Sequence, residues 1–226
     1  MRTNLGGKPT IAVFFLDKDV DDFTRRKRRS RHTIYTRFYD VQNEIFRNGN
    51  LVRGSAAAAS IDPALLAQQF SNTGMWCSQA AERWREWATL CLVSAIKCIN
   101  QQCNYRVQSQ VQNPLNGQLD AARLRQTVRQ MAAKVGMTLP IFKRGHRRIR
   151  KRVMQLYLSG QQDRVFKGKW YAALIDEDVR RLMGQADYDK QGFSSRVTCA
   201  VAATLSFTDP WANYYTGRLA DIIDNP

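Results

Sequence analysis

The feature that most constrains the fold is an apolar run, Ile11 to Leu16, which ends directly at the acidic tripeptide Asp17-Lys18-Asp19. A short run of β-branched and aromatic residues with polar residues behind it is typical of a strand buried in a parallel sheet. Functional groups of open α/β sheets gather at the carboxyl ends of such strands. We therefore expect an α/β core with Asp17 and Asp19 at the functional edge of its sheet.

Two carboxylates in an Asp-x-Asp spacing can share a divalent metal ion. Mg²⁺ takes oxygen ligands and usually binds through one or two carboxylates together with substrate phosphates, which suits phosphodiester chemistry. The same spacing also occurs in solvated turns. The motif alone therefore leaves both interpretations open.

The charge of the chain indicates the partner. Lys and Arg number 35 against 19 Asp and Glu, which gives a formal net charge of +16 at pH 7. Such an excess is the electrostatic footprint of a protein with a phosphate-rich partner, so we expect nucleic acid, either DNA or RNA. A solvated basic face or a nuclear-import signal is the alternative.

The positive charge is concentrated in residues 25–31 and 143–152. Such runs release counterions from a phosphate backbone, so their binding should weaken steeply with salt, but they carry no sequence specificity. A membrane-surface helix shares the amphipathic pattern of the second run, but its few inward-facing residues favour nucleic acid. The candidate nucleic-acid-binding residues are Arg25, Arg26, Arg28, Arg29, Arg144, Arg147, Arg148, Arg150 and Lys151.

The local patterns divide the chain near residue 60. Residues 1–60 form the predicted α/β portion, with a second strand from Thr33 to Tyr39. Residues 61–226 are predicted to be a mainly helical region packed on the first. Expected helices cover residues 63–74, 75–100, 120–136 and 171–183, and another covers the second basic run. Tryptophans at three- and four-residue spacing, Trp76, Trp84 and Trp87, are expected in the core.

Two further patterns bear on location and cysteine chemistry. No apolar stretch approaches the roughly 18 residues that span a bilayer, and the N-terminus lacks a signal-peptide pattern, so we expect a soluble, cytoplasmic protein without a membrane partner. The five cysteines lack paired metal-ligand spacing. Cys91 and Cys98 lie in an apolar helical pattern, which predicts buried, reduced thiols.

The turn Lys167-Gly168-Lys169 precedes the predicted helix 171–183. Ammonium groups, backbone N–H donors and the helix dipole are suited to bind a phosphate. The same tripeptide is also a common surface turn. A functional role is favoured if the fold places the turn beside Asp17.

The order of these segments resembles a TOPRIM-like family. The resemblance rests on the apolar strand with Asp17-Lys18-Asp19, the strand leading into Asp40-Val41-Gln42-Asn43, a long helical middle, and the late Phe166-Lys167-Gly168-Lys169. The family comprises prokaryotic TOPRIM-domain proteins related to the nuclease half of overcoming-lysogenization-defect proteins. It includes the nuclease effector of an ATPase-partnered phage-defence system.

The resemblance implies a partial TOPRIM α/β core that binds Mg²⁺ or Mn²⁺ and cleaves nucleic-acid phosphodiesters. It assigns Asp17 and Asp19 as metal ligands, and Lys167 or Lys169 as the group that stabilises charge on the scissile phosphate. It also implies a role in phage defence and an ATPase partner or a homo-oligomer.

Two departures from the family pattern concern catalysis. TOPRIM sites also need a glutamate at the end of an earlier strand, and with about ten residues before Ile11 we expect no such strand here. Gln42 and Glu44 stand where relatives tend to carry Glu and Tyr. Three explanations remain open: the true start lies upstream of Met1, the chain is a degenerate copy that binds without cutting, or Glu44 or Asp40 completes the metal site.

Two functions therefore stay open at the level of sequence. The first is a metal-dependent nuclease of the TOPRIM type. The second is a catalytically incomplete nucleic-acid-binding or partner-regulated subunit. A structural protein that packages nucleic acid also fits the charge, but it leaves Asp17-Lys18-Asp19 unexplained.

Overall fold

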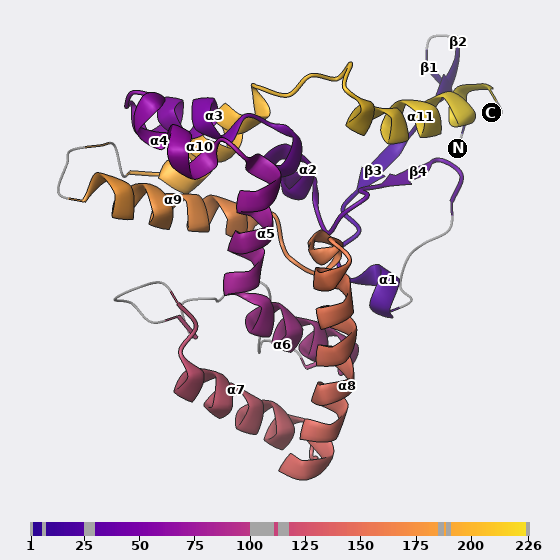
Figure 1. The fold of residues 1–226 in the computed structure, drawn as a ribbon. Coiled ribbons are helices and arrows are strands. Elements are labelled where there is room, and N and C mark those ends of the chain that lie inside the picture. Colours follow the sequence, from indigo (N-terminus) through magenta and orange to yellow (C-terminus); the bar gives the residue numbers. More distant parts are fainter. Residues whose placement is uncertain are drawn as a thin grey trace.

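The computed structural model describes residues 2–5, 8–24, 30–99, 111–112, 118–184, 188 and 191–224. In this part of the chain the fold is mostly helical with two small two-stranded sheets (Figure 1), which agrees with an α/β class that carries a large helical appendage. The strands are β1 (Arg2–Leu5), β2 (Lys8–Ile11), β3 (Phe14–Leu16) and β4 (Thr33–Tyr35). The helices of the first half are α1 (Asp21–Thr24), α2 (Val41–Asn48), α3 (Leu51–Ala59), α4 (Ala64–Phe70), α5 (Thr73–Arg83) and α6 (Arg85–Ile96). Those of the second half are α7 (Ala121–Lys134), α8 (Leu139–Leu158), α9 (Lys169–Met183), α10 (Phe193–Ala202) and α11 (Asn213–Asp224), with short 3₁₀ turns η2 (Gln162–Arg164) and η3 (Pro210–Ala212).

Strands β3 and β4 form a parallel pair, in register from Phe14 opposite Thr33 to Leu16 opposite Tyr35. The parallel pairing agrees with the sequence prediction, but the predicted burial of the apolar run is wrong. Phe14, Phe15 and Leu16 are all exposed, because β4 is the one described strand that pairs with β3.

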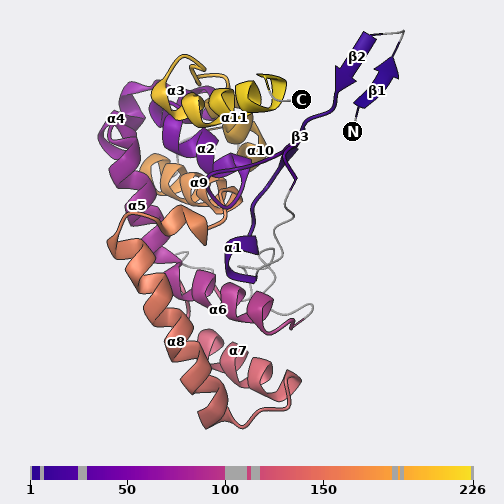
Figure 2. The same ribbon diagram turned by 90° about the vertical axis from the view of Figure 1, so that its right-hand side faces the viewer.

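The expectation that no strand precedes Ile11 is also wrong. β1 pairs antiparallel with β2, with Arg2 opposite Ile11, and Figure 2 shows this hairpin projecting away from the helices. The predicted strand is therefore divided, since Ile11 ends β2 and Phe14 begins β3. A local hairpin needs only a short connection, so Arg2–Ile11 can hold both strands.

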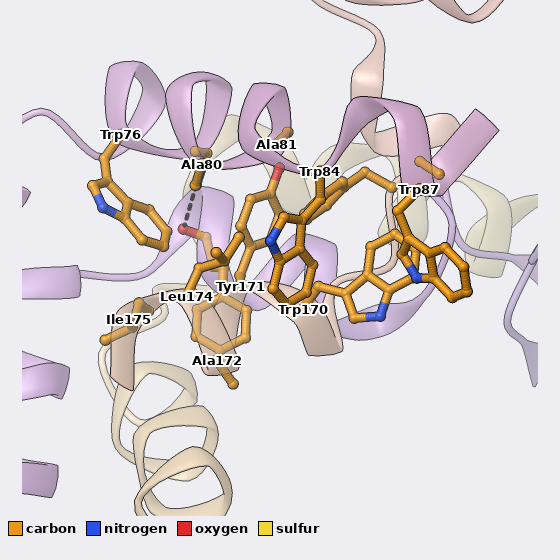
Figure 3. Close-up of a cluster of buried hydrophobic side chains, with 14 of the residues drawn as sticks. Trp76, Ala80, Ala81, Trp84, Trp87, Trp170, Tyr171, Ala172, Leu174 and Ile175 are labelled. Carbon is orange, nitrogen blue, oxygen red and sulfur yellow. Dashed lines mark hydrogen bonds between the residues drawn. The ribbon is translucent and has the colours of Figure 1, made fainter. Parts of the chain in front are cut away.

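The main core lies among α2, α3, α5, α9 and α10, where α10 packs on α3, α9 and α2. The predicted burial of the tryptophans is confirmed, since Trp76, Trp84 and Trp87 are at most 2% exposed. Figure 3 shows these rings beside Trp170 and Tyr171 of α9, and the centroids of Trp84 and Trp170 lie 5.9 Å apart in an edge-on arrangement. The boundary predicted at residue 60 falls between α3 and α4, within this continuous cluster.

The helix predicted over residues 75–100 is two helices, because the backbone breaks at Trp84 (φ −116°) between α5 and α6. α6 ends at Ile96, and Cys98 follows in a left-handed turn (φ 52°) that exposes its thiol. The expected burial is therefore confirmed for Cys91 and wrong for Cys98.

Helices α7 and α8 extend from the core below α6, and α8 packs along α6 (Figures 1 and 2). Asp120 caps α7, since its Oδ1 accepts from the N–H groups of Ala122 at 2.8 Å and Arg123 at 2.9 Å. Across the described ranges, no helix is both long enough and apolar enough to cross a membrane.

Candidate functional site

The segments that follow β3 and β4 are hydrogen-bonded to each other. The Asp19 N–H donates to the Tyr39 carbonyl at 2.7 Å, and the Lys18 N–H donates to Thr36 Oγ1 at 2.9 Å. Asp19 has a φ of 48°, a left-handed conformation that Asp adopts more readily than most residues. The acidic turn and the start of α2 therefore meet at one edge of the parallel pair.

Asp17 lies at the N-terminus of α2. Its Oδ1 accepts from the N–H of Val41, the first residue of that helix, at 3.0 Å. A helix N-terminus carries partial positive charge and so favours a carboxylate. Asp17 is nevertheless an exposed residue, so a ligand can approach it from solvent.

Asp40 is the N-cap of α2, and the negative charge of Asp17 acts on its carboxyl group. Its Oδ1 accepts from the backbone N–H groups of Asn43 and Gly168, both at 3.1 Å, and Asn43 Oδ1 accepts the Asp40 N–H in return. Oδ2 of Asp40 is buried without a hydrogen-bond partner. Burial, together with the negative charge of Asp17, raises the pKa of Asp40 to about 7, and Lys167 opposes the shift.

The Lys167-Gly168-Lys169 turn packs directly on this helix cap. A Cβ at Gly168 would lie 2.3 Å from both Asp40 Oδ1 and the Asn43 nitrogen, so the close approach requires glycine. Lys167 is half-buried, and Lys169 is exposed at the first position of α9. The fold thus brings the turn to the same helix end that binds Asp17.

The other two predicted metal ligands are bonded elsewhere. A side-chain hydrogen bond joins Asp19 to Tyr39, whose pKa is raised by burial and by the charge of Asp19. Glu44 is buried, and its two oxygens accept from the Arg37 guanidinium at 3.1 and 2.8 Å. Tyr215 of α11 donates to the same carboxylate at 2.6 Å. Within the described ranges, no three His, Cys, Asp or Glu side chains form a group that could hold a metal ion.

A buried aspartate that no sequence motif marks supports the turn. Asp163 Oδ1 accepts from Asn43 Nδ2 at 3.1 Å and from the Tyr171 hydroxyl at 2.5 Å, and Oδ2 binds Arg47. Burial raises the pKa of Asp163, and Arg47 opposes the shift. Asn43, which the family resemblance marks, therefore positions η2 and the Lys-Gly-Lys turn rather than facing solvent.

The second basic run forms the middle of α8, and α7 adds to the same cationic region. Between residues 121 and 158 the sequence has no Asp or Glu, and every Lys and Arg side chain there is exposed. Arg150 is paired with Glu86 of α6, Nε to Oε1 at 2.8 Å. The cations of this face are Arg123, Arg125, Arg129, Lys134, Lys143, Arg144, Arg147, Arg148, Arg150, Lys151 and Arg152. Arg25, Arg26, Arg28 and Arg29 of the first run lie outside the described residues.

Comparisons of the chain with protein-family models, with curated proteins and with solved structures found no match. The resemblance to TOPRIM-like proteins therefore stays a hypothesis. The candidate site is assigned from its own residues and their contacts.

Proposed function

We propose that the protein is a metal-dependent nuclease of the TOPRIM type, which hydrolyses phosphodiester bonds of DNA or RNA at the N-terminal end of α2. The observation that carries this proposal is the convergence of Asp17, Asp40 and the Lys167-Gly168-Lys169 turn on one helix end. Carboxylates suit a hard cation, and ammonium groups beside a helix N-terminus suit the phosphate that bridges to it. A role in phage defence with an ATPase partner rests on the family resemblance alone.

Asp17 and Asp40 are the side chains that fit a Mg²⁺ or Mn²⁺ ion, in place of the set Asp17, Asp19 and Glu44. The unpartnered Oδ2 of Asp40 and the repulsion between the two carboxylates are features that a bound cation would relieve. When bound, such an ion polarises the scissile phosphate and lowers the pKa of a water molecule. In this proposal Lys167 and Lys169 stabilise negative charge on the phosphate oxygens.

The α7–α8 face supplies the affinity for nucleic acid in this proposal. Its cations are exposed, and the two helices contain no Asp or Glu that would neutralise them, although Arg150 is paired with Glu86 of α6. Their binding is electrostatic and independent of sequence.

The test is Mn²⁺ titration of the full chain by calorimetry, followed by a cleavage assay on the same samples. Asp17→Asn and Asp40→Asn remove the charge but keep an oxygen that can accept the N–H bonds of α2, so the helix cap is retained. Asp209→Asn, an exposed change outside the site, is the control. We expect at least tenfold weaker Mn²⁺ binding and loss of cleavage in the first two variants only. Unchanged metal-dependent cleavage in both would contradict the proposal.

Binding without cleavage is the second candidate function. It is favoured by the engagement of Glu44 with Arg37, which leaves two carboxylates rather than three for a metal. In this case the wild-type chain binds nucleic acid in a salt-dependent manner, with no effect of Mn²⁺ and no cleavage. The same samples distinguish the two functions.

A further inference from the structure

A cavity of about 470 Å³ opens between α6, α7 and α8, and none of its lining residues belongs to the candidate site at the N-terminal end of α2. Its wall is apolar and includes Leu90 of α6 together with Leu124 and Val128 of α7. Exposed cations line its opening from both helices of the cationic face. These cations are Arg125, Arg129, Lys143 and Arg147.

His146 of α8 also lines the cavity, and its Nε2 is buried without a hydrogen-bond partner. Buried polar atoms in proteins are nearly always bonded, so an unbonded nitrogen on a residue that lines a cavity is a candidate contact for a ligand atom. Glu86 is the carboxylate in the lining, and its Oε1 is already bonded to Arg150 Nε at 2.8 Å. The cavity therefore combines an apolar wall, one free imidazole nitrogen and a positive opening.

We propose that this cavity binds one nucleotide, with the base against the apolar wall and the phosphate among the arginines and Lys143. The volume lies within the range of roughly 300–1,000 Å³ typical of small-molecule sites. The imidazole nitrogen can donate to or accept from a base edge, depending on its tautomer. Binding of the phosphate backbone alone would need only cations at the surface. It does not account for the apolar cavity behind them.

The proposal rests on the proposed function and names its substrate class, which is single-stranded nucleic acid. A base in a duplex is stacked and paired, and its removal costs a few kcal/mol. A base in a single strand can unstack and enter a pocket, and this is how proteins usually recognise single-stranded RNA. A free nucleotide presents the same chemistry, so the test includes both forms.

Val128→Trp fills the cavity without changing the charge of the face. Gln126→Trp adds the same ring to an exposed position of α7 and is the matched control. We measure the anisotropy of a labelled single strand and of the duplex of the same sequence. We expect Val128→Trp to bind the single strand about tenfold more weakly than wild type and to bind the duplex with unchanged affinity. Gln126→Trp should bind both with wild-type affinity. Equal single-strand affinity in Val128→Trp and wild type would overturn the inference.

A second measurement uses the wild-type chain and does not depend on the folding of a variant. The sequence has two histidines, His32 and His146, so their imidazole NMR signals can be followed separately. Saturable shifts of the His146 signal with a thymidine oligonucleotide support the strand as ligand, and shifts with adenosine monophosphate support the free nucleotide. No shift of His146 with either ligand, or shifts that inorganic phosphate reproduces, would overturn the inference.

The cavity site and the proposed nuclease activity can be disproved separately. Metal-dependent cleavage of a single strand with no effect of Val128→Trp and no shift of His146 contradicts the cavity site and leaves the proposed nuclease intact. A nucleotide-dependent shift of His146 in a chain that neither binds Mn²⁺ nor cleaves contradicts the nuclease and leaves the cavity site intact.

Discussion

At the scale of single residues, the candidate site depends on the contact between Gly168 and the cap of α2. The Gly168 N–H donates to Asp40 Oδ1, and the same oxygen accepts the Asn43 N–H. One carboxylate oxygen therefore holds two segments 128 residues apart in the chain. This contact leaves the second oxygen of Asp40 unbonded at the helix end.

A pair of Gly→Ala substitutions should have opposite effects on stability. Gly168→Ala should lower the free energy of unfolding by about 2–3 kcal/mol, because its Cβ would collide with the backbone of α2. A Cβ at Gly145 in α8 would have no neighbouring atom within 4 Å. Gly145→Ala should therefore raise the free energy of unfolding by about 0.5–1 kcal/mol, since glycine is unfavourable inside a helix. Urea denaturation measures both, and equal effects would contradict the packing at Gly168.

Asp40 should make stability depend on pH. Its pKa of about 7 in the folded chain exceeds the ordinary value of 3.8, so the folded state binds its proton more tightly. The stabilisation of the folded state by this proton is complete below about pH 4. It is lost as the pH rises toward 7 and amounts to on the order of a few kcal/mol. We expect Asp40→Asn to gain stability relative to wild type between pH 4 and pH 8. Denaturation without divalent metal measures the difference, and a constant difference would contradict the assigned pKa.

At the scale of elements, Glu44 joins three parts of the fold. Its carboxylate links α2 to Arg37 after β4 and to Tyr215 of α11. Tyr214, the neighbour of Tyr215, donates to the Tyr35 carbonyl of β4 at 3.0 Å. The carboxylate that sequence reasoning offered as a metal ligand thus serves as the attachment point of the C-terminal helix.

Loss of this attachment should be measurable. Glu44→Ala should lower the free energy of unfolding by about 2–3 kcal/mol, because it leaves the half-buried Arg37 without its partner. Tyr215→Phe removes one neutral donor and should cost about 1 kcal/mol. Hydrogen exchange should show faster exchange of α11 in Glu44→Ala than in wild type.

A separate measurement decides the predicted metal role of Glu44. Because both of its oxygens bind Arg37, Glu44→Gln should leave the affinity for Mn²⁺ within about twofold of the wild-type value. A tenfold loss of affinity in a folded Glu44→Gln variant would restore Glu44 to the ligand set.

At the scale of the whole molecule, charge is distributed unevenly over the fold. Helices α7 and α8 project from the core (Figure 2), and their charged side chains are all positive. The acidic residues Asp17 and Asp19 follow β3, and Asp40 caps α2. A phosphate backbone would therefore be attracted first to the helical appendage.

The salt dependence of nucleic-acid binding should show whether the α7–α8 face makes the phosphate contacts. Arg144→Gln with Arg148→Gln should reduce the slope of log affinity against log salt by about 1.5 for a nucleic acid, since each phosphate contact contributes roughly 0.7–0.9. Arg53→Gln with Arg218→Gln removes the same charge from exposed positions of α3 and α11 and should change the slope little. Equal slopes for the two double variants would place the binding face elsewhere.

The local features of this chain followed from its sequence. The buried tryptophans and the positions of the strands around Phe15 and Ile34 follow from hydrophobic periodicity within each segment. The second basic run also formed a helix with exposed cations, because its pattern leaves few apolar residues to bury.

Only the tertiary structure decided which partner each carboxylate takes. Asp17 and Asp40 both bind the N-terminal end of α2, while Asp19 bonds Tyr39 and Glu44 bonds Arg37, because each side chain takes the donor that packing brings nearest. The same is true of Asp163 and of the cavity beside His146, which no local pattern marks. Sequence fixes which chemical groups are present and how each segment folds locally, whereas the pairing of groups depends on contacts between residues far apart in the chain.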